Sequence, residues 1–107
     1  MTHAGFEDFI KKFLAELGHT LVQGNKEYGH SGDNDSAFAN FERAAKALRV
    51  SREDVNRIYA WKHEDAINGY LYRGIEQIRE PIRGRFIDKI AYDIIWAAMI
   101  LDGGDDG

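Results

Sequence analysis

Residues 84–101, with the sequence GRFIDKIAYDIIWAAMIL, decide the fold because a long apolar run here has the spacing of an α-helix. At about 100° per residue, one broad apolar face of this helix contains Phe86, Ile87, Ile90, Ile94, Ala97, Ala98 and Leu101. A second apolar stripe contains Tyr92, Ile95 and Met99. The pattern predicts a helix that is mostly covered, either by the rest of the chain or by a partner subunit.

Two aspartates interrupt this apolar helix, at positions 88 and 93. Side chains five positions apart on an α-helix point roughly 140° away from each other, so Asp88 and Asp93 cannot converge on one ion. Asp93 lies on a polar strip of the helix, whereas Asp88 falls among the apolar side chains of the second stripe. A carboxylate in that position needs a partner. Asp88 is therefore the candidate for a functional site inside the protein.

The chain before this helix predicts further helices. Apolar side chains at three- and four-residue steps indicate an amphipathic helix over residues 6–23. The polar, glycine-containing stretch KEYGHSGDND at residues 26–35 indicates a loop, where ligand contacts commonly lie. A second helix is expected to begin at Asp35 or Ser36, because either residue can cap a helix.

A third helix is predicted from Arg52 to about Tyr72, because Ser51 begins a sequence that resembles a capping box. Pro81 suits the first turn of the final helix. Four helices without any segment of alternating apolar residues predict an all-α fold, a helical bundle of about four helices.

The third predicted helix has an unusual apolar face. The side chains expected on that face are Val55, Ile58, Tyr59, Ala66, Gly69 and Tyr70. Lys62 falls near the middle of the group, where a lysine either extends its charge to solvent or meets a buried anion. One interpretation of Asp88 is therefore a buried ion pair with Lys62. The alternative is that Asp88 faces a ligand.

The length of the chain, 107 residues, is most simply that of one domain. We expect this domain to span residues 1–102 and the acidic tail at residues 103–107 to be disordered. So short a chain buries both apolar stripes of the final helix most readily in a homo-oligomer. Trp61 and Trp96 lie off the main apolar faces, which suits a subunit interface.

Composition excludes several classes of protein. The absence of cysteine excludes disulfides, thiolate metal sites and thiolate nucleophiles. A net charge of -4 argues against nucleic acid as a partner. The sequence predicts neither a signal peptide nor a membrane span, so we expect a cytoplasmic protein without a membrane partner.

Several short motifs carry a resemblance to a known group of proteins. They are Lys26-Glu27-Tyr28-Gly29, Asn40-Phe41, Lys62-His63, and Gly84-Arg85 followed by Asp88 and Tyr92. In this order and spacing, over about residues 17–101, the chain resembles the MazG-like all-α nucleotide pyrophosphatases. Within that group it is most similar to nucleotide modification associated domain 1. The resemblance implies a helical, often oligomeric protein that binds or hydrolyses a nucleotide, in a phage or phage-derived context.

The resemblance also implies roles for individual residues. Lys26, Tyr28 and Asn40 would contact the nucleotide, and Arg43 and Lys62 would neutralise its phosphates. Asp88 would hold a magnesium ion. If the protein is an enzyme, a metal-activated water would attack a phosphoanhydride bond. The alternatives are that Tyr28 packs on the end of the bundle and that Asn40 bonds to loop backbone.

The chain departs from the group at the metal site. MazG-like pyrophosphatases hold magnesium with acidic pairs that include Glu-x-x-Asp, but the position three before Asp88 is Arg85. Glu64 and Asp65 on the third helix are neighbours and point about 100° apart, so they do not form such a pair. This departure favours a second hypothesis: a non-catalytic, oligomeric helical module that sequesters a nucleotide signal or binds a host protein.

Other charged residues give weaker signals. The histidines at positions 19, 30 and 63 do not have the paired spacing of metal ligands, so we do not expect them to bind metal. Arg79, Arg83 and Arg85 form a basic group that we interpret as a solvated face rather than a phosphate site.

Overall fold

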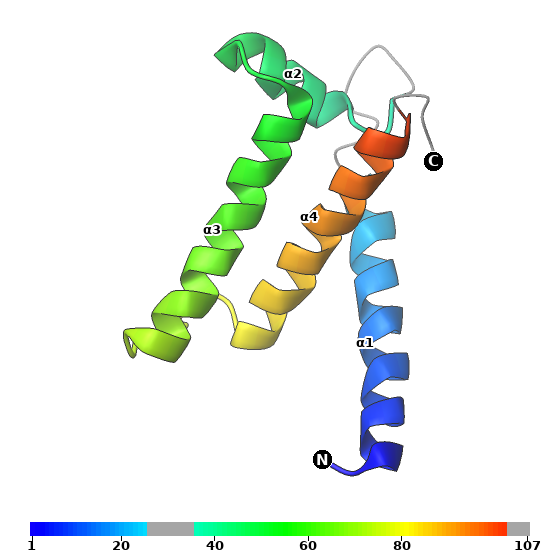
Figure 1. Cartoon of the computed structure of the whole chain (residues 1–107), viewed down its shortest axis with the longest axis vertical. Coiled ribbons are helices and arrows are strands. Elements are labelled where there is room, and N and C mark those ends of the chain that lie inside the picture. The colour runs from blue at the N-terminus through cyan, green and yellow to red at the C-terminus, as the bar shows by residue number, and fades with distance from the viewer. Residues whose placement is uncertain (26–35, 103–107) are drawn as a thin grey trace.

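The computed structural model describes residues 1–25 and 36–102. In these residues it contains four α-helices and no strand, which confirms the all-α prediction (Figure 1). The helices are α1 (His3–Gly24), α2 (Ala39–Leu48), α3 (Arg52–Tyr72) and α4 (Ile82–Asp102). The predicted loop at residues 26–35, with Lys26 and Tyr28, lies outside the described residues, as does the acidic tail at residues 103–107. None of the described helices combines the length and apolar character needed to cross a membrane.

The helices pack in series rather than all around one centre. Among the described helices, α3 packs against α4, α2 packs against α3, and α1 packs against α4 (Figure 1). The molecule is elongated, with extents of 46 × 31 × 28 Å and a radius of gyration of 15.8 Å. A compact chain of this length would have a radius of gyration of about 13 Å. Helix α4 therefore joins two halves of the structure, because it contacts both α1 and α3.

Side-chain caps fix the start of two helices. The hydroxyl of Ser51 accepts a hydrogen bond from the backbone N–H of Asp54 at 3.0 Å, as the sequence predicted, and α3 has the predicted bounds. The hydroxyl of Thr2 likewise accepts from the N–H of Gly5 at 3.0 Å, so α1 begins three residues before the predicted Phe6. Each cap satisfies a donor that the first helical turn leaves without a partner.

Two predicted helix starts are wrong, that of α2 by three or four residues and that of α4 by one. Helix α2 begins at Ala39 and not at Asp35 or Ser36, because the hydroxyl of Ser36 accepts from the N–H of Phe38 at 3.1 Å and so stabilises a turn before the helix. Helix α4 begins at Ile82, and Pro81 directly precedes it instead of occupying its first turn. The carbonyl of Pro81 accepts from the N–H of Gly84 and Arg85 at 2.9 and 3.3 Å.

The core consists of two clusters on different sides of α4. The first contains Phe41, Ala45, Val55 and Met99, and Phe38, Ala44, Tyr92 and Ile95 pack against it. The second contains Leu17, Ile87 and Ala91, with Phe13, Leu21 and Ile90 beside them. The second apolar stripe of the sequence thus faces α2 and α3, while part of the broad face meets α1.

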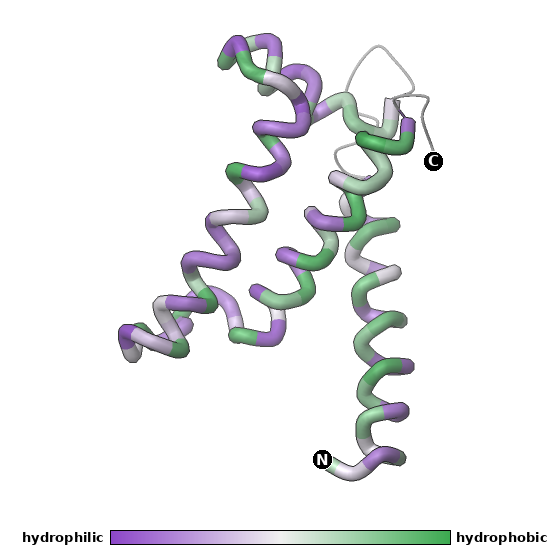
Figure 2. Tube along the Cα trace, in the orientation of Figure 1, coloured by the Kyte–Doolittle hydropathy of each residue, from purple (hydrophilic) through white to green (hydrophobic). Residues whose placement is uncertain are grey.

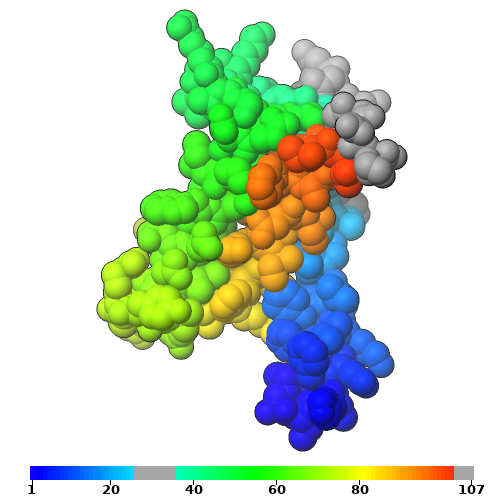
Figure 3. All heavy atoms as spheres, in the orientation of Figure 1, coloured from blue at the N-terminus to red at the C-terminus, as the bar shows by residue number. Residues whose placement is uncertain are grey.

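The single chain covers α4 only in part, so full cover of this helix would require the partner subunit that the sequence suggests. Phe86, Ile94, Ile100 and Leu101 are exposed, because α1 covers only part of the broad apolar face. Helix α1 also leaves Phe6 and Leu14 exposed, and Figure 2 shows apolar residues along its whole length. The amino-terminal half of α1 projects beyond the other helices (Figure 3).

The predicted buried face of α3 is also partly wrong. The residues that the structure buries are Val55, Asn56, Ala60, His63, Ile67 and Gly69, whereas Ile58, Tyr59 and Tyr70 are exposed. Two of the buried residues are polar. A prediction based only on apolar residues therefore places the buried face of α3 at the wrong rotation about the helix axis. Lys62 is exposed as a consequence.

Candidate functional site

Three potential metal ligands meet where α3, α4 and the connection between them come together. His63 lies on α3, Glu80 lies in the connection, and Asp88 lies on α4. One nitrogen or carboxylate oxygen from each residue lies within 4.8 Å of the others. We call these three residues the His63 cluster.

Glycine at the start of α4 leaves space for one member of the cluster. A Cβ atom at Gly84 would lie 3.1 Å from Oε1 and 3.2 Å from Cγ of Glu80. Such contacts are closer than ordinary van der Waals separation, so a larger residue at position 84 would push the Glu80 side chain away. The glycine therefore helps to position the Glu80 carboxylate.

Arg85 places a positive charge between two members of the cluster. Its Nη1 lies 3.2 Å from Nδ1 of His63 and 3.4 Å from Oε2 of Glu80. Its Nε donates to Oε1 of Gln77 at 3.3 Å. The guanidinium is held from several sides, so it is a fixed part of the cluster rather than a solvated charge.

The contact with Arg85 defines the protonation of His63. A guanidinium only donates hydrogen bonds, so Nδ1 of His63 accepts and the proton of the neutral ring lies on Nε2. Burial lowers the pKa of His63, which favours this neutral form. Nε2 points toward Oδ2 of Asp88 at 3.9 Å, and the ring stacks on Tyr92 with centroids 5.7 Å apart.

Among the carboxylates that the structure describes, Asp88 has the most strongly shifted pKa. Burial raises its pKa to about 7, and a hydrogen bond with Glu80 and the negative charge of Glu80 act in the same direction. The positive charges of Arg85 and Lys62 oppose the increase. At neutral pH, the Asp88 carboxyl is therefore divided between its protonated and ionised forms.

The structure does not contain the ion pair between Asp88 and Lys62, which was one of the two interpretations of Asp88. Both residues belong to the described part of the chain, and Asp88 instead faces His63 and Glu80. Lys62 lies one position before His63, so its side chain points about 100° away from that of His63 and is exposed. It influences Asp88 only through its charge.

Sequence reasoning missed two of the three cluster residues. His63 was assigned no metal role because its spacing to other histidines is unlike that of paired ligands, and Glu80 was not singled out at all. The three residues occupy positions 63, 80 and 88 in two helices and a connection, so no periodic motif joins them.

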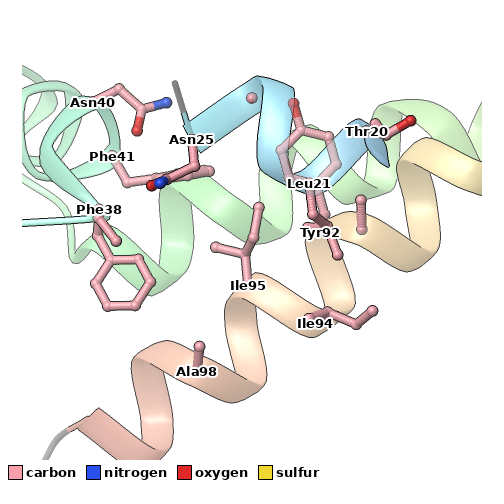
Figure 4. A pocket seen from close by; sticks show the side chains of 13 residues that line it. Thr20, Leu21, Asn25, Phe38, Asn40, Phe41, Tyr92, Ile94, Ile95 and Ala98 are labelled. Carbon is pink, nitrogen blue, oxygen red and sulfur yellow. The ribbon is translucent and has the colours of Figure 1, made fainter. Parts of the chain in front are cut away.

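A separate pocket of about 350 Å³ lies between the end of α1, the start of α2 and α4 (Figure 4). It is lined by Thr20, Leu21, Gly24, Asn25, Ala37, Phe38, Asn40, Phe41, Ala91, Tyr92, Ile94, Ile95 and Ala98. The walls are mainly apolar and aromatic, with the amides of Asn25 and Asn40 among them. Of the predicted nucleotide contacts that the structure describes, only Asn40 lines this pocket; Arg43 and Lys62 do not.

Tyr92 connects the pocket with the His63 cluster. It lines the pocket, and its ring stacks on that of His63. Asp88 precedes Tyr92 by four residues, which is about 6 Å along the axis of α4. An apolar pocket and a charged cluster therefore lie next to each other along one helix.

Comparison of the chain with protein-family models, with curated proteins and with solved structures finds no significant match.

Proposed function

We propose that the protein binds a nucleotide, with the base in the pocket between α1, α2 and α4. The observation that carries this proposal is the composition of the pocket: Phe38, Phe41 and Tyr92 line it together with two amides. Aromatic side chains stack on bases, a contact worth roughly 1–3 kcal/mol per base. The amides of Asn25 and Asn40 offer both donors and acceptors for the edge of a base.

The phosphates of the nucleotide would extend along α4 toward the His63 cluster. Glu80 and Asp88 would repel a phosphate unless a cation lay between them, so we expect binding to depend on a divalent cation. Asp88 is the residue to which the resemblance to MazG-like proteins gives a magnesium ion. Exposed Lys62 lies beside the cluster in sequence and would add positive charge. This arrangement agrees with the role of the MazG-like proteins that the sequence resembles.

Hydrolysis is the stronger form of the proposal. It would require a metal-activated water to attack a phosphoanhydride bond. Arg85 stands where those proteins keep an acidic ligand, so the chain supplies fewer carboxylates for a two-metal site. Incubation with a panel of deoxynucleoside triphosphates and magnesium tests this form directly. Release of monophosphate and pyrophosphate would establish the enzyme, and the absence of turnover would leave a binding protein.

Asn40→Ala is expected to weaken nucleotide binding about tenfold, because one lost hydrogen bond in a desolvated pocket costs roughly 1–1.5 kcal/mol. Isothermal titration calorimetry with magnesium present measures the effect. Asn68→Ala, which removes an exposed amide on α3, is the matched control and should bind as the wild type does. Equal affinities for Asn40→Ala and the wild type, or no binding of any nucleotide in the panel, would reject the proposed pocket.

A second candidate function is a helical module that assembles with copies of itself. The observation that favours it is the exposed apolar side of α1, where Phe6 and Leu14 are more than half exposed, at 53% and 58%. Arg83 covers only part of this helix: its guanidinium lies 5.7 Å from the ring centroid of Phe9 and pairs with Glu16 at 2.8 Å. Monomers seldom expose a continuous apolar strip of this kind.

Multi-angle light scattering at micromolar concentration is expected to give at least twice the monomer mass of 12.2 kDa. Leu14→Glu should shift the protein toward the monomer, because a charge in an apolar interface loses its hydration. Leu71→Glu is the matched control, since Leu71 is also exposed, at 55%, but lies near the end of α3. A wild-type monomer at these concentrations would exclude the assembly.

A further inference from the structure

We propose that His63, Glu80 and Asp88 form a binding site for a divalent cation that accepts a nitrogen ligand, such as Zn²⁺, and that Arg85 is the internal competitor of this cation. The inference goes beyond nucleotide binding and does not depend on it, because the three side chains and the arginine are sufficient to define the site.

The kind of ligand selects the kind of cation. Mg²⁺ prefers oxygen ligands in octahedral geometry, whereas Zn²⁺ and Co²⁺ readily combine imidazole nitrogen with carboxylate oxygen. One imidazole and two carboxylates, with a water as fourth ligand, match an open zinc site. The resemblance to MazG-like proteins implies magnesium at Asp88, but it does not take account of the imidazole of His63 beside that carboxylate. The donor set of the structure favours zinc.

His63 provides an independent indication that the cluster accepts a ligand. Its side chain is only 9% exposed, and Nε2 points at Oδ2 of Asp88 from 3.9 Å, which is too long for a hydrogen bond. Stacking on Tyr92 fixes the plane of the ring. A buried imidazole is thus aimed into the cluster with Nε2 poorly satisfied, and this nitrogen would bind a metal ion after the ring proton moves to Nδ1.

The side chains of Glu80 and Asp88 can move toward a metal ion and leave it a route from solvent. Ligand atoms around a tetrahedral zinc ion lie about 3.4 Å apart, as follows from Zn–ligand distances near 2.1 Å. The cluster atoms lie within 4.8 Å of one another, so their separations must shorten by at most about 1.4 Å. The side chains of Glu80 and Asp88 are each 31% exposed, which leaves them room to rotate and gives an ion a route from solvent.

The guanidinium of Arg85 already contacts the groups that a bound metal cation would contact. A single nitrogen, Nη1, contacts both Nδ1 of His63 and Oε2 of Glu80. The guanidinium hydrogen-bonds to the lone pair of Nδ1. A metal ion bound at Nδ1 would need this lone pair, and a metal ion bound at Nε2 would require a proton on Nδ1. In either case Arg85 must leave before a metal can bind. Removal of its charge should therefore strengthen metal binding.

The test uses the untagged full chain, stripped of metal by a chelator and titrated with Co²⁺ alone, without nucleotide. Visible absorption of Co²⁺ reports the ligands, and competition with a chromophoric chelator gives the affinity for Zn²⁺. We expect the wild type to bind one Co²⁺ at the cluster. His63→Gln and Glu80→Gln should each weaken binding about tenfold or more, and Arg85→Gln should strengthen it about tenfold. Glu64→Gln, at an exposed position beside His63, should have no effect.

Circular dichroism of each metal-free variant shows whether it is folded, and Glu80→Gln, at a partly exposed position, tests the site even if His63→Gln does not fold. The proposal is overturned if the wild type binds no Co²⁺ or Zn²⁺, if Glu80→Gln binds them as the wild type does, or if Arg85→Gln fails to bind more tightly. The proposal is also overturned if only the Arg85→Gln variant binds metal, because Arg85 would then fill the site permanently in the wild-type protein. Since no nucleotide is present, these outcomes are independent of whether the pocket binds one.

Discussion

Asn56→Ala is expected to lower the free energy of unfolding by about 2–3 kcal/mol, because Asn56 is a fully buried polar residue that links α3 to α4. Its Nδ2 donates to the backbone carbonyl of Tyr92 at 3.0 Å. Its Oδ1 accepts from Nε and Nη2 of Arg57 at 3.0 and 2.8 Å. The alanine variant loses all three hydrogen bonds and leaves a cavity.

The loss extends beyond Asn56, because Arg57 depends on it. Nη2 of Arg57 also pairs with Oδ1 of Asp93 at 2.9 Å, and the guanidinium lies 3.9 Å from the ring centroid of Trp96. Without Asn56, Arg57 keeps only its contacts with α4. Removal of the Asn56 side chain therefore weakens the contacts that hold α3 and α4 in a fixed orientation.

Urea denaturation followed by circular dichroism measures this effect. The matched control is Asn68→Ala, which removes an exposed amide on the same helix and should change the free energy of unfolding by less than about 0.5 kcal/mol. If the two variants were equally stable, the buried link between α3 and α4 would not contribute as we describe.

The stability of the metal-free protein is expected to fall between pH 5 and pH 8 through Asp88. The folded state raises the pKa of this carboxyl from its ordinary value of 3.8 to about 7, mainly by burial and then through Glu80. In this range the folded state therefore binds more protons than the unfolded state, and stability decreases as pH rises. The stabilisation from Asp88 is fully present below the pKa of this carboxyl in the unfolded state. It is lost as pH rises through the pKa of Asp88 in the folded state.

Asp88→Asn should remove this pH dependence, because asparagine resembles the protonated carboxyl. A shift of about three units corresponds to at most about 4 kcal/mol, and we expect about 1–2 kcal/mol between pH 5 and pH 8 because the side chain is partly solvated. Burial lowers the pKa of His63 and so destabilises the protein as pH falls below 6.5, which is the opposite sign. The difference between wild type and variant isolates Asp88.

Chemical denaturation at several pH values, with a chelator present, provides the measurement. Asp8→Asn removes an exposed carboxyl that pairs with Lys12 on α1 and is the control. Its profile should follow that of the wild type. Parallel profiles for Asp88→Asn and the wild type would show that Asp88 does not titrate in this window.

The sequence was sufficient to predict the helices but not how they are rotated against each other. Period and capping predicted α3 from Ser51, with the bounds that the structure has. They failed at α2, where the hydroxyl of Ser36 stabilises a turn instead of a helix. The buried face of α3 was misjudged because Asn56 and His63 are polar and yet buried. Such residues are buried only because specific partners exist, and partners such as the Tyr92 carbonyl and Arg85 come from other elements.

The need for partners from other elements also explains which residues of the His63 cluster the sequence could predict. Asp88 could be singled out because a carboxylate among apolar side chains is anomalous on its own helix. Its neighbours could not be named, since Lys62 and His63 are adjacent in sequence and a rotation of α3 by one residue exchanges them. Glu80 lies in the connection, where helical period carries no information.

Among the described helices, α1 packs only against α4, which has a consequence for the order of folding. The contact between His63 and Arg85 closes 22 residues of chain, whereas that between Glu16 and Arg83 closes 67. The longer loop costs about 1 kcal/mol more entropy to close. We therefore expect the hairpin of α3 and α4 to form early and α1 to dock onto it late, so that the first helix of the chain is the last to reach its native position.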